Sequence, residues 1–298
     1  MEEFSTLINY LEQLGTEYKI NAETAHISTM KTGGVAKIII FPSSLKEFIS
    51  ILKKIDIKFA IIGNGSNSMF CDGIYDGAVI VTKKLNKITV SGNVIFAECG
   101  ASILSCCKLA LEKSLSGLEF AFGIPGSIGG AVYMNASAFG SEFDSVVYES
   151  TVYDRINDKV FTIDGSKHEF SKKMSVFQNK EWYILQCKLK LRVDSWESIK
   201  SKMDSYMNYR IKSQPLDMPS LGSTFKRPEN AYASELIDKA GLKGYKIGGA
   251  SVSDKHAGFI VNCGNATSND VLSLISYIKK EISNQFNIKL EEEIIYFN

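Results

Sequence analysis

The sequence contains few of the residues that build metal centres, and it lacks long apolar runs. Its three histidines, His26, His168 and His256, stand far apart, and no H-E-x-x-H motif is present. The six cysteines form no C-x-x-C pair, so the spacing of a zinc site is missing. No apolar run approaches the about 18 residues that a membrane-spanning helix needs. We therefore expect no bound metal, no membrane span and free thiols packed as small apolar groups.

An excess of charge of one sign is also missing. Lysine and arginine total 34 and aspartate and glutamate total 33, which gives a net charge of +1. This balance argues against a protein that coats nucleic acid or lies on a membrane surface. The first residues, MEEFSTLINY, lack the basic and apolar regions of a signal peptide, so we expect a cytoplasmic protein. Arginine is scarce (Arg155, Arg192, Arg210 and Arg227), which limits where a two-pronged clamp for a carboxylate or phosphate can come from.

The hydrophobic pattern predicts a mixture of helices and strands. The chain length of 298 residues suggests two or three domains. Apolar residues at helical spacing occur in 2–14, 102–113 and 269–284, after a Ser44–Glu47 capping box, and after Ser195. Strand patterns occur in 36–41, 58–62, 77–81 and 183–193, in a hairpin over 87–98, on both sides of an Asn157–Asp158 turn, and in the terminal EIIYF. Because the two kinds of element mix without strict βαβ alternation, the predicted fold class is α+β, with a boundary near residue 195.

Two glycine-rich loops are the clearest chemical signals. GNGSNS (63–68) follows a predicted strand, but Ser68 replaces the third glycine of a dinucleotide fingerprint and no helix follows. GIPGSIGGA (123–131) is the second loop, and NASAFG (135–140) comes soon after it. Either loop alone could be a steric turn. Successive backbone N–H groups in such loops can bind an anion, so the two together favour a large phosphate-bearing cofactor.

A family resemblance extends over nearly the whole chain. Its segments, in order, are STMKTGG (28–34), IIGNGSNSMFCDG (61–73), GLEFAFGIPGSIGGAVYMNASAFGSE (117–142), QPLDMPSLGSTFKRP (214–228), ELIDKAGLKGYKIGGASVSDKHAGFIVN (235–262) and EEEIIYF (291–297). With these segments the chain resembles the UDP-N-acetylenolpyruvoylglucosamine reductases, in the shorter of that family's two types. The resemblance implies a PCMH-type FAD-binding module of two subdomains, at 1–85 and 86–194. A C-terminal α+β substrate-binding domain follows at 195–298, and the final strand near 291–297 is a candidate to return to the first subdomain.

The resemblance also implies a cofactor and a reaction. NADPH reduces FAD, and the reduced flavin gives a hydride to the enolpyruvyl double bond of UDP-N-acetylglucosamine enolpyruvate. The product is UDP-N-acetylmuramate, a precursor of peptidoglycan. The implied FAD contacts are Gly63, Asn64, Gly65, Ser66, Asn67, Gly123, Ile124, Pro125, Gly126, Ser127, Gly129, Gly130, Asn135, Ala136 and Ser137.

Catalysis needs an acid and positive charge, because negative charge develops on the carbon next to the substrate carboxylate. Ser223 in GSTF matches the family's proton-donating serine, and Glu293 matches the glutamate of its terminal E-V-R motif. Lys226 and Arg227 follow closely and suit a pyrophosphate. Without the resemblance, Ser223 would be interpreted as a turn serine, Glu293 as one solvated charge within 291–293, and the basic pair as ordinary surface.

Two positions depart from the family pattern. Lys173 stands where the family has the arginine of Y-R-x-S-x-F, and Ile295 replaces the arginine of E-V-R. Lysine keeps the charge but lacks the planar fork, and one lost charge-assisted hydrogen bond is worth about 1.5–3 kcal/mol. These departures leave open a divergent, non-catalytic paralogue that binds flavin or a nucleotide sugar. An oxygen-using PCMH-type oxidase is a third interpretation, against which Ser223 and Glu293 speak. We expect a monomer.

Overall fold

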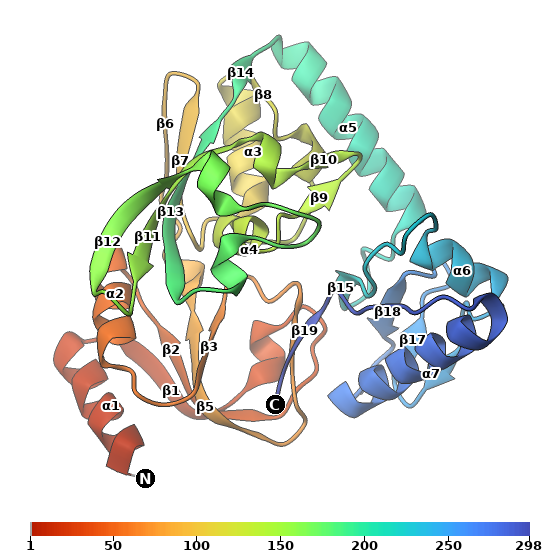
Figure 1. Cartoon of the computed structure of the whole chain (residues 1–298), viewed down its shortest axis with the longest axis horizontal. Helices are drawn as coiled ribbons and strands as arrows, with labels where there is room; N and C mark the ends of the chain where they lie inside the picture. The colour runs from red at the N-terminus through yellow and green to blue at the C-terminus, as the bar shows by residue number, and fades with distance from the viewer. Residues whose placement is uncertain (1) are drawn as a thin grey trace. The chain divides into compact units, whose positions relative to one another are not determined.

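The computed structural model describes residues 2–298, which form two compact units interleaved along the chain (Figure 1). The first unit comprises the chain up to Lys19, Ile39–Asn64 and Ala78–Asn208, and the second comprises Ile20–Ile38, Gly65–Gly77 and Tyr209–Asn298. Helices and strands mix within each unit, which confirms the predicted α+β class. The predicted domain limits at 85 and 194 stay a prediction.

The N-terminal third of the chain forms two helices and a four-stranded sheet. The helices are α1 (Glu2–Leu14) and α2 (Leu45–Lys54), and the strands, in sheet order, are β1 (Glu17–Glu23), β2 (Val35–Phe41), β5 (Ile74–Val81) and β3 (Phe59–Ile62). The structure confirms the two predicted helices, over 2–14 and after the Ser44–Glu47 capping box, and the predicted strands in 36–41, 58–62 and 77–81. Ser44 caps α2 by accepting the Glu47 N–H at 3.2 Å, while the Glu47 carboxylate also reaches back to the N–H and hydroxyl of Ser43.

A five-stranded antiparallel sheet forms the centre of the first unit. Its strands, in sheet order, are β12 (Lys159–Asp164), β11 (Val147–Asp154), β13 (Trp182–Lys190), β7 (Val94–Glu98) and β6 (Ile88–Ser91). The predicted hairpin over 87–98 is therefore confirmed. Helices α3 (Ile103–Glu112) and α4 (Ile128–Tyr133) contact this sheet at β7 and β13, around a core that includes Ile95, Cys187 and Leu189.

The inward alternation predicted for 183–193 ends before its last member. Cys187 and Leu189 are buried as expected, but Val193 is 78% exposed. The reason is that β13 ends at Lys190, and Val193 lies in the separate short strand β14 (Arg192–Val193). This strand pairs with β8 (Leu115–Ser116), so the alternation along β13 no longer determines which way Val193 points.

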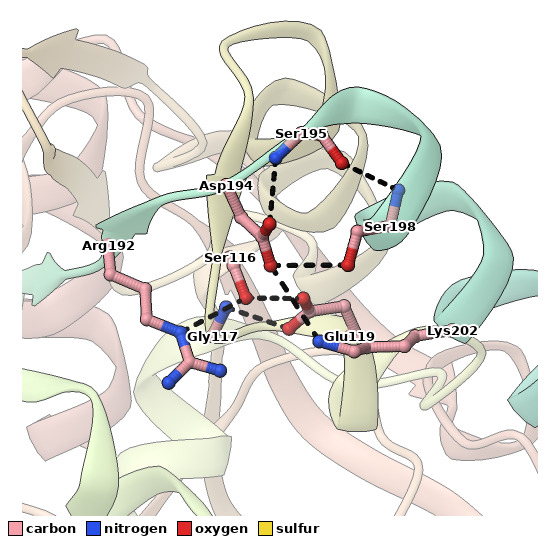
Figure 2. A network of polar contacts seen from close by, with 8 residues as sticks. All are labelled: Ser116, Gly117, Glu119, Arg192, Asp194, Ser195, Ser198 and Lys202. Carbon is pink, nitrogen blue, oxygen red and sulfur yellow. Dashed lines mark hydrogen bonds and ion pairs between the residues drawn. The ribbon is translucent and has the colours of Figure 1, made fainter.

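The chain enters the second glycine-rich loop through a polar turn (Figure 2). The Glu119 carboxylate is 7% exposed and accepts two hydrogen bonds, from the Ser116 hydroxyl and the Gly117 N–H, each at 2.7 Å. Arg192 donates from Nε to the Ser116 hydroxyl oxygen at 3.4 Å. Because Glu119 begins the 3-10 turn Glu119–Ala121, these bonds fix the backbone immediately before the loop.

The same view shows how α5 (Trp196–Ser213) begins (Figure 2). Ser195 Oγ accepts the Ser198 N–H at 3.2 Å, and Asp194 accepts the Ser198 hydroxyl at 3.3 Å. Lys202 lies 3.8 Å from the Asp194 carboxylate. The hydrogen bond from the Ser195 N–H is the largest cause holding the pKa of Asp194 below its ordinary value. The helix predicted after Ser195 is thus confirmed, with a side-chain cap at its start.

The second unit contains an antiparallel sheet and two of the molecule's helices. The strands, in sheet order, are β15 (Ser220–Ser223), β18 (Phe259–Asn262), β17 (Ala250–Val252) and β16 (Lys246–Ile247), and the helices are α6 (Ala233–Lys239) and α7 (Ser268–Phe286). The buried face of α7 includes Val271, Ile275 and Ile278, as its periodicity predicts. The terminal strand β19 (Ile295–Phe297) pairs in parallel with β4 (Ser68–Phe70), so the end of the chain joins the segment that follows the first glycine-rich loop.

One further short hairpin, β9 (Ser137–Ala138) with β10 (Ser141–Glu142), lies in the first unit. Among residues 2–298, no helix is both long and apolar enough to cross a bilayer. The described part of the chain also contains no cluster of three or more histidine, cysteine or acidic side chains arranged to hold a metal ion.

Candidate active site

Ser223 is an exposed residue set between buried ones. It ends β15 and pairs with Phe259, while Leu221, Thr224 and Phe225 are each less than 5% exposed. The next residue is held twice, because the Thr224 N–H donates to the Gly258 carbonyl at 2.9 Å and its hydroxyl oxygen accepts the Ile260 N–H at 3.3 Å. Within residues 2–298, the Ser223 hydroxyl makes no hydrogen bond to the chain. A turn serine would often bond to its own turn, and the described chain shows no such bond.

The segment around Glu293 runs antiparallel to the segment that carries Ser223. The Glu293 N–H donates to the Thr224 carbonyl at 2.9 Å, and the Lys226 N–H donates to the Glu291 carbonyl at 2.8 Å. The bridge between Phe225 and Glu292 lies between these two bonds. The structure therefore places side by side the backbone segments that carry the predicted acid and the predicted glutamate, which are separated by 70 positions in the sequence.

The three successive glutamates have different surroundings. Glu291 is mostly exposed and pairs with Lys226 at 3.3 Å, and Glu292 pairs with Lys279 at 2.8 Å. Both are surface ion pairs, which contribute little to stability. Glu293 is half-buried and is the one whose N–H bonds to the segment that carries Ser223. Glu291 and Glu292 are thus engaged in surface ion pairs, and the role of Glu293 stays a prediction.

The end of the first glycine-rich loop joins the same backbone. Asn67 donates from Nδ2 to the Glu293 carbonyl at 3.0 Å, and its own carbonyl accepts the Ile295 N–H at 2.9 Å. Thr29 adds a second connection, because its N–H bonds to the Gly65 carbonyl at 3.0 Å and its hydroxyl to the Ser220 carbonyl at 2.6 Å. We call residues 65–67, 220–226 and 291–295 the serine–glutamate cluster.

The first glycine-rich loop has the donors that an anion needs. Among the described residues, the backbone N–H groups of Asn64, Gly65 and Ser66 donate to no other group of the chain. Gly65 has a φ of +69°, and a Cβ there would lie 1.9 Å from the Ile27 carbonyl oxygen, so no other residue fits. Successive N–H groups in a tight loop form an anion-binding concavity. This donor set suits the diphosphate of FAD.

The start of this loop packs on the second glycine-rich loop inside the first unit. A Cβ on Gly63 would lie 2.0 Å from Ser127 Oγ, and Asn64 donates from Nδ2 to the Pro125 carbonyl at 2.5 Å. Ser127 also caps α4 by accepting the Gly130 N–H at 3.3 Å. The absence of a side chain at Gly63 thus permits close contact between the two loops, a role that the sequence analysis did not anticipate.

Asn135 has a structural role that the motif did not reveal. Its side chain is 1% exposed and makes three hydrogen bonds inside the first unit. It donates to Glu142 Oε2 at 2.8 Å and to the Ser171 carbonyl at 3.1 Å, and it accepts the Asp144 N–H at 3.0 Å. The polar atoms of the Asn135 side chain are therefore used within the fold.

Lys173 lies in a tight turn of the first unit. Ser171 and Met174 exchange backbone hydrogen bonds of 3.1 Å on either side of it, and we call residues 171–174 the lysine turn. Through the bond from Asn135 to Ser171, this turn is attached to the predicted FAD segment 123–137. Ser223 and Glu293 belong to the second unit, so the predicted catalytic residues are divided between the two units.

The basic pair after Ser223 has aromatic and acidic neighbours. Lys226 pairs with Glu291, as described above, and the Arg227 guanidinium carbon lies 3.9 Å from the centre of the Tyr232 ring. Tyr232 is 48% exposed. Sequence reasoning missed Tyr232 and Thr29. The only signals for them were an aromatic five residues after Arg227 and a hydroxyl within the STMKTGG segment.

Comparison with known proteins covers both units. Residues 214–297 match the family model for the C-terminal domain of UDP-N-acetylenolpyruvoylglucosamine reductase, and residues 36–163 match an FAD binding domain. The chain is 42% identical over 293 residues to the UDP-N-acetylenolpyruvoylglucosamine reductase of Caldanaerobacter subterraneus subsp. tengcongensis, with 97% of each protein covered. It is 44% identical over 280 residues to that of Pseudothermotoga lettingae, covering 93% of this chain and 97% of the relative. The crystal structure of the reductase from Thermus caldophilus matches with a TM-score of 0.82 at 27% identity, covering 95% of this chain and 99% of the other.

Proposed function

The chain belongs to the UDP-N-acetylenolpyruvoylglucosamine reductase family, and we propose that it catalyses the reaction of that family. It uses NADPH to reduce UDP-N-acetylglucosamine enolpyruvate to UDP-N-acetylmuramate, a step in peptidoglycan precursor synthesis. The observation that carries this proposal is the serine–glutamate cluster. Its hydrogen bonds connect the end of the first glycine-rich loop with the segments that carry an exposed serine and a half-buried glutamate, all within one compact unit.

FAD fits the residues present. The N–H groups of 64–66 and the small residues of 123–137 would hold its diphosphate and its ring system. When bound, FAD would supply the transfer of a hydride from NADPH to the terminal carbon of the substrate's double bond. The chain's own residues must then provide a proton for the neighbouring carbon and stabilise the charge that develops there.

We assign the proton to the Ser223 hydroxyl, which is exposed and has no competing bond within the described chain. Glu293 is the acid–base group. The bond from its N–H to the Thr224 carbonyl fixes its backbone next to the segment that carries Ser223. Lys173 supplies positive charge for the substrate carboxylate. Lys226 and Arg227 bind the pyrophosphate of the UDP group, since the carbonyl partner of the Lys226 N–H fixes the start of this pair.

We place the reaction in the cytoplasm and expect a monomer that binds neither nucleic acid nor membrane. The net charge of +1 supports the absence of a polyanionic partner. All six cysteines are free thiols, which suits a reducing compartment. Size-exclusion chromatography with light scattering tests the oligomeric state.

A divergent paralogue that binds flavin without catalysis is the second candidate. Lys173 and Ile295 favour it, because both replace an arginine of the family pattern. However, the Ile295 N–H still bonds to Asn67, so the backbone of the cluster does not depend on the missing guanidinium.

Stopped-flow absorbance of the bound flavin, with each substrate added in turn, separates the candidates. For a reductase, NADPH bleaches the flavin and the enolpyruvyl sugar restores its colour. A flavin that NADPH bleaches but that does not respond to this sugar would exclude the proposed substrate. If turnover appeared only in the Lys173→Arg, Ile295→Arg double variant, the paralogue would be the correct interpretation.

A further inference from the structure

The lysine turn has an unusual backbone for its sequence. Its two central residues are Lys172 and Lys173, and of these only Lys173 has a positive φ, of +60°. A two-residue turn with positive φ at its second central position is typical of type II, where glycine or asparagine is the usual residue. A lysine in the left-handed region is strained. A charged side chain at such a position must be held by its surroundings.

Three polar side chains hold this turn against the end of α4. Asn135 donates to the Ser171 carbonyl at 3.1 Å, and Ser175 donates from Oγ to the Tyr133 carbonyl at 2.7 Å. Gln178 donates from Nε2 to two carbonyls, those of Tyr133 and Lys173, each at 3.0 Å. Tyr133 is the last residue of α4. Together these bonds connect the turn and the residues directly after it to the end of α4 and to Asn135.

Gln178 differs from the other two because it bonds to the backbone of Lys173 itself. Its amide carries two N–H donors. Their two oxygen acceptors are carbonyls from two different segments, and Met134 Sδ lies 3.9 Å from the same nitrogen. One side chain thus fixes the strained residue relative to the end of α4. Gln178 is only partly buried and sits in the 3-10 turn Val176–Gln178, which is rigidly attached to the turn through Ser175.

The identity of Lys173 makes this attachment more important. An arginine fork fixes its own direction toward a carboxylate through two parallel donors, whereas an ammonium is a point charge on a flexible stem. With lysine at this position, the place of the charge depends more strongly on the place of the backbone.

We propose that Gln178 is a positioning residue for the reduction. By bonding Tyr133 and Lys173 together, it sets the position from which the Lys173 ammonium reaches the substrate carboxylate. This inference rests on the proposed function, which gives Lys173 its role toward the sugar.

The test is a double-mutant cycle of Gln178→Met and Lys173→Met, followed by stopped-flow absorbance of the flavin. Methionine has a length similar to that of glutamine, no N–H donor and no charge. We expect Gln178→Met to slow flavin re-oxidation by the enolpyruvyl sugar about 10-fold and to raise KM for the sugar. Flavin content and reduction by NADPH should stay within about twofold of wild type. In the Lys173→Met background, the second substitution should cause no further slowing.

Gln285→Met is the matched control, because Gln285 bonds to a single carboxylate on α7 and lies outside the lysine turn. If Gln178→Met loses flavin, Gln178→Arg provides the second test, since its N–H groups can still reach both carbonyls. Its sugar half-reaction should stay within about threefold of wild type.

The outcomes separate this inference from the proposed function. A wild-type rate of re-oxidation in Gln178→Met would overturn the positioning role, and so would equal slowing of both half-reactions or a tenfold slower Gln178→Arg. Slowing by Gln178→Met that persists in the Lys173→Met background would also overturn it. If Lys173→Met itself re-oxidises normally, the role proposed for Lys173 is wrong, and the inference about Gln178 fails with it.

Discussion

Backbone hydrogen bonds hold the serine–glutamate cluster, whereas hydrogen bonds from side chains provide most of the attachment of the lysine turn. In the cluster, backbone N–H groups of Lys226, Glu293 and Ile295 bond to backbone carbonyls. In the lysine turn, the side chains of Asn135, Ser175 and Gln178 provide most of the attachment. Backbone bonds do not depend on side-chain identity, whereas side-chain bonds do. The cluster should therefore tolerate substitutions such as Ile295, and the lysine turn should be sensitive to them.

Substitution of the serine should give the largest effect. Ser223→Ala removes the proton donor but none of the backbone bonds, so reduction of the flavin by NADPH should be unchanged. Re-oxidation by the enolpyruvyl sugar should slow by about 10²–10⁴-fold, measured by stopped-flow absorbance. Ser205→Ala, an exposed serine on α5, is the control. Equal slowing of both half-reactions would contradict the role given to Ser223.

Substitution of Asn135, which attaches the lysine turn, and of Asn67, which lies in the serine–glutamate cluster, compares the two kinds of attachment. Asn135→Ala removes three hydrogen bonds of a buried side chain and should lower the free energy of unfolding by about 3 kcal/mol. Asn67→Ala removes one side-chain bond and leaves the carbonyl bond to Ile295, so we expect a loss of about 1 kcal/mol. Urea denaturation followed by circular dichroism measures both. Equal losses would show that the distinction between backbone and side-chain attachment does not hold.

Removal of the charge from the lysine turn should affect only one half-reaction. Lys173→Met should slow re-oxidation by the sugar about 10- to 100-fold, which corresponds to the loss of one charge-assisted hydrogen bond. Lys172→Met changes the exposed neighbour in the same turn and serves as the control. If both variants slow the reaction to the same extent, the effect comes from the net charge of the turn and not from the position of Lys173.

The smallest expected effect is a pH dependence that comes from the first unit. His168 is fully buried, faces the carbonyls of Asp164 and Gly165 through Nδ1, and accepts the Ser150 hydroxyl at Nε2. Burial lowers its pKa below 6.5, and the carbonyl hydrogen bonds act in the opposite direction. The unfolded chain therefore binds a proton below pH 6.5 that the folded chain does not. Stability should fall as the pH drops from 6.5 toward the folded pKa, with a slope of at most about 1.4 kcal/mol per pH unit.

Urea denaturation at pH 7.5 and pH 5.5 measures this dependence. His168→Gln should flatten it, whereas His26→Gln changes an exposed histidine and should leave it unchanged. If the pH dependence is the same in all three proteins, His168 does not cause it.

The sequence predicted local structure well because periodicity and turn residues act over short distances. The hairpin over β6 and β7 follows from its strand pattern and its Ser91-Gly92-Asn93 turn, and the buried face of α7 follows from apolar spacing. It could not place Val193, since the strand ends three residues earlier. It also could not reveal that Thr29 bonds to Ser220, because these residues are 191 positions apart and neither belongs to a recognisable pair.

The candidate site was predicted by motif and not by geometry. The two glycine-rich loops came from their composition and spacing, and the roles of Ser223 and Glu293 came from the family resemblance. Their distribution between two compact units, and the role of Gly63 in letting the loops touch, required the structure. Asn135 illustrates the limit of motif reading, because a residue inside a binding motif can use its whole side chain to hold the fold.

The most direct test of Ser223 as the proton donor in this reduction is a single turnover in D₂O without oxygen. NADPH-reduced protein is mixed with the enolpyruvyl sugar, and flavin colour and product are followed together. We predict that the colour returns as one UDP-N-acetylmuramate forms per flavin. Solvent deuterium should then appear at the carbon next to the carboxylate in wild type, and its delivery should be slowed in Ser223→Ala. A flavin that stays bleached in the presence of the sugar, or deuterium delivered equally fast without the serine, would contradict it.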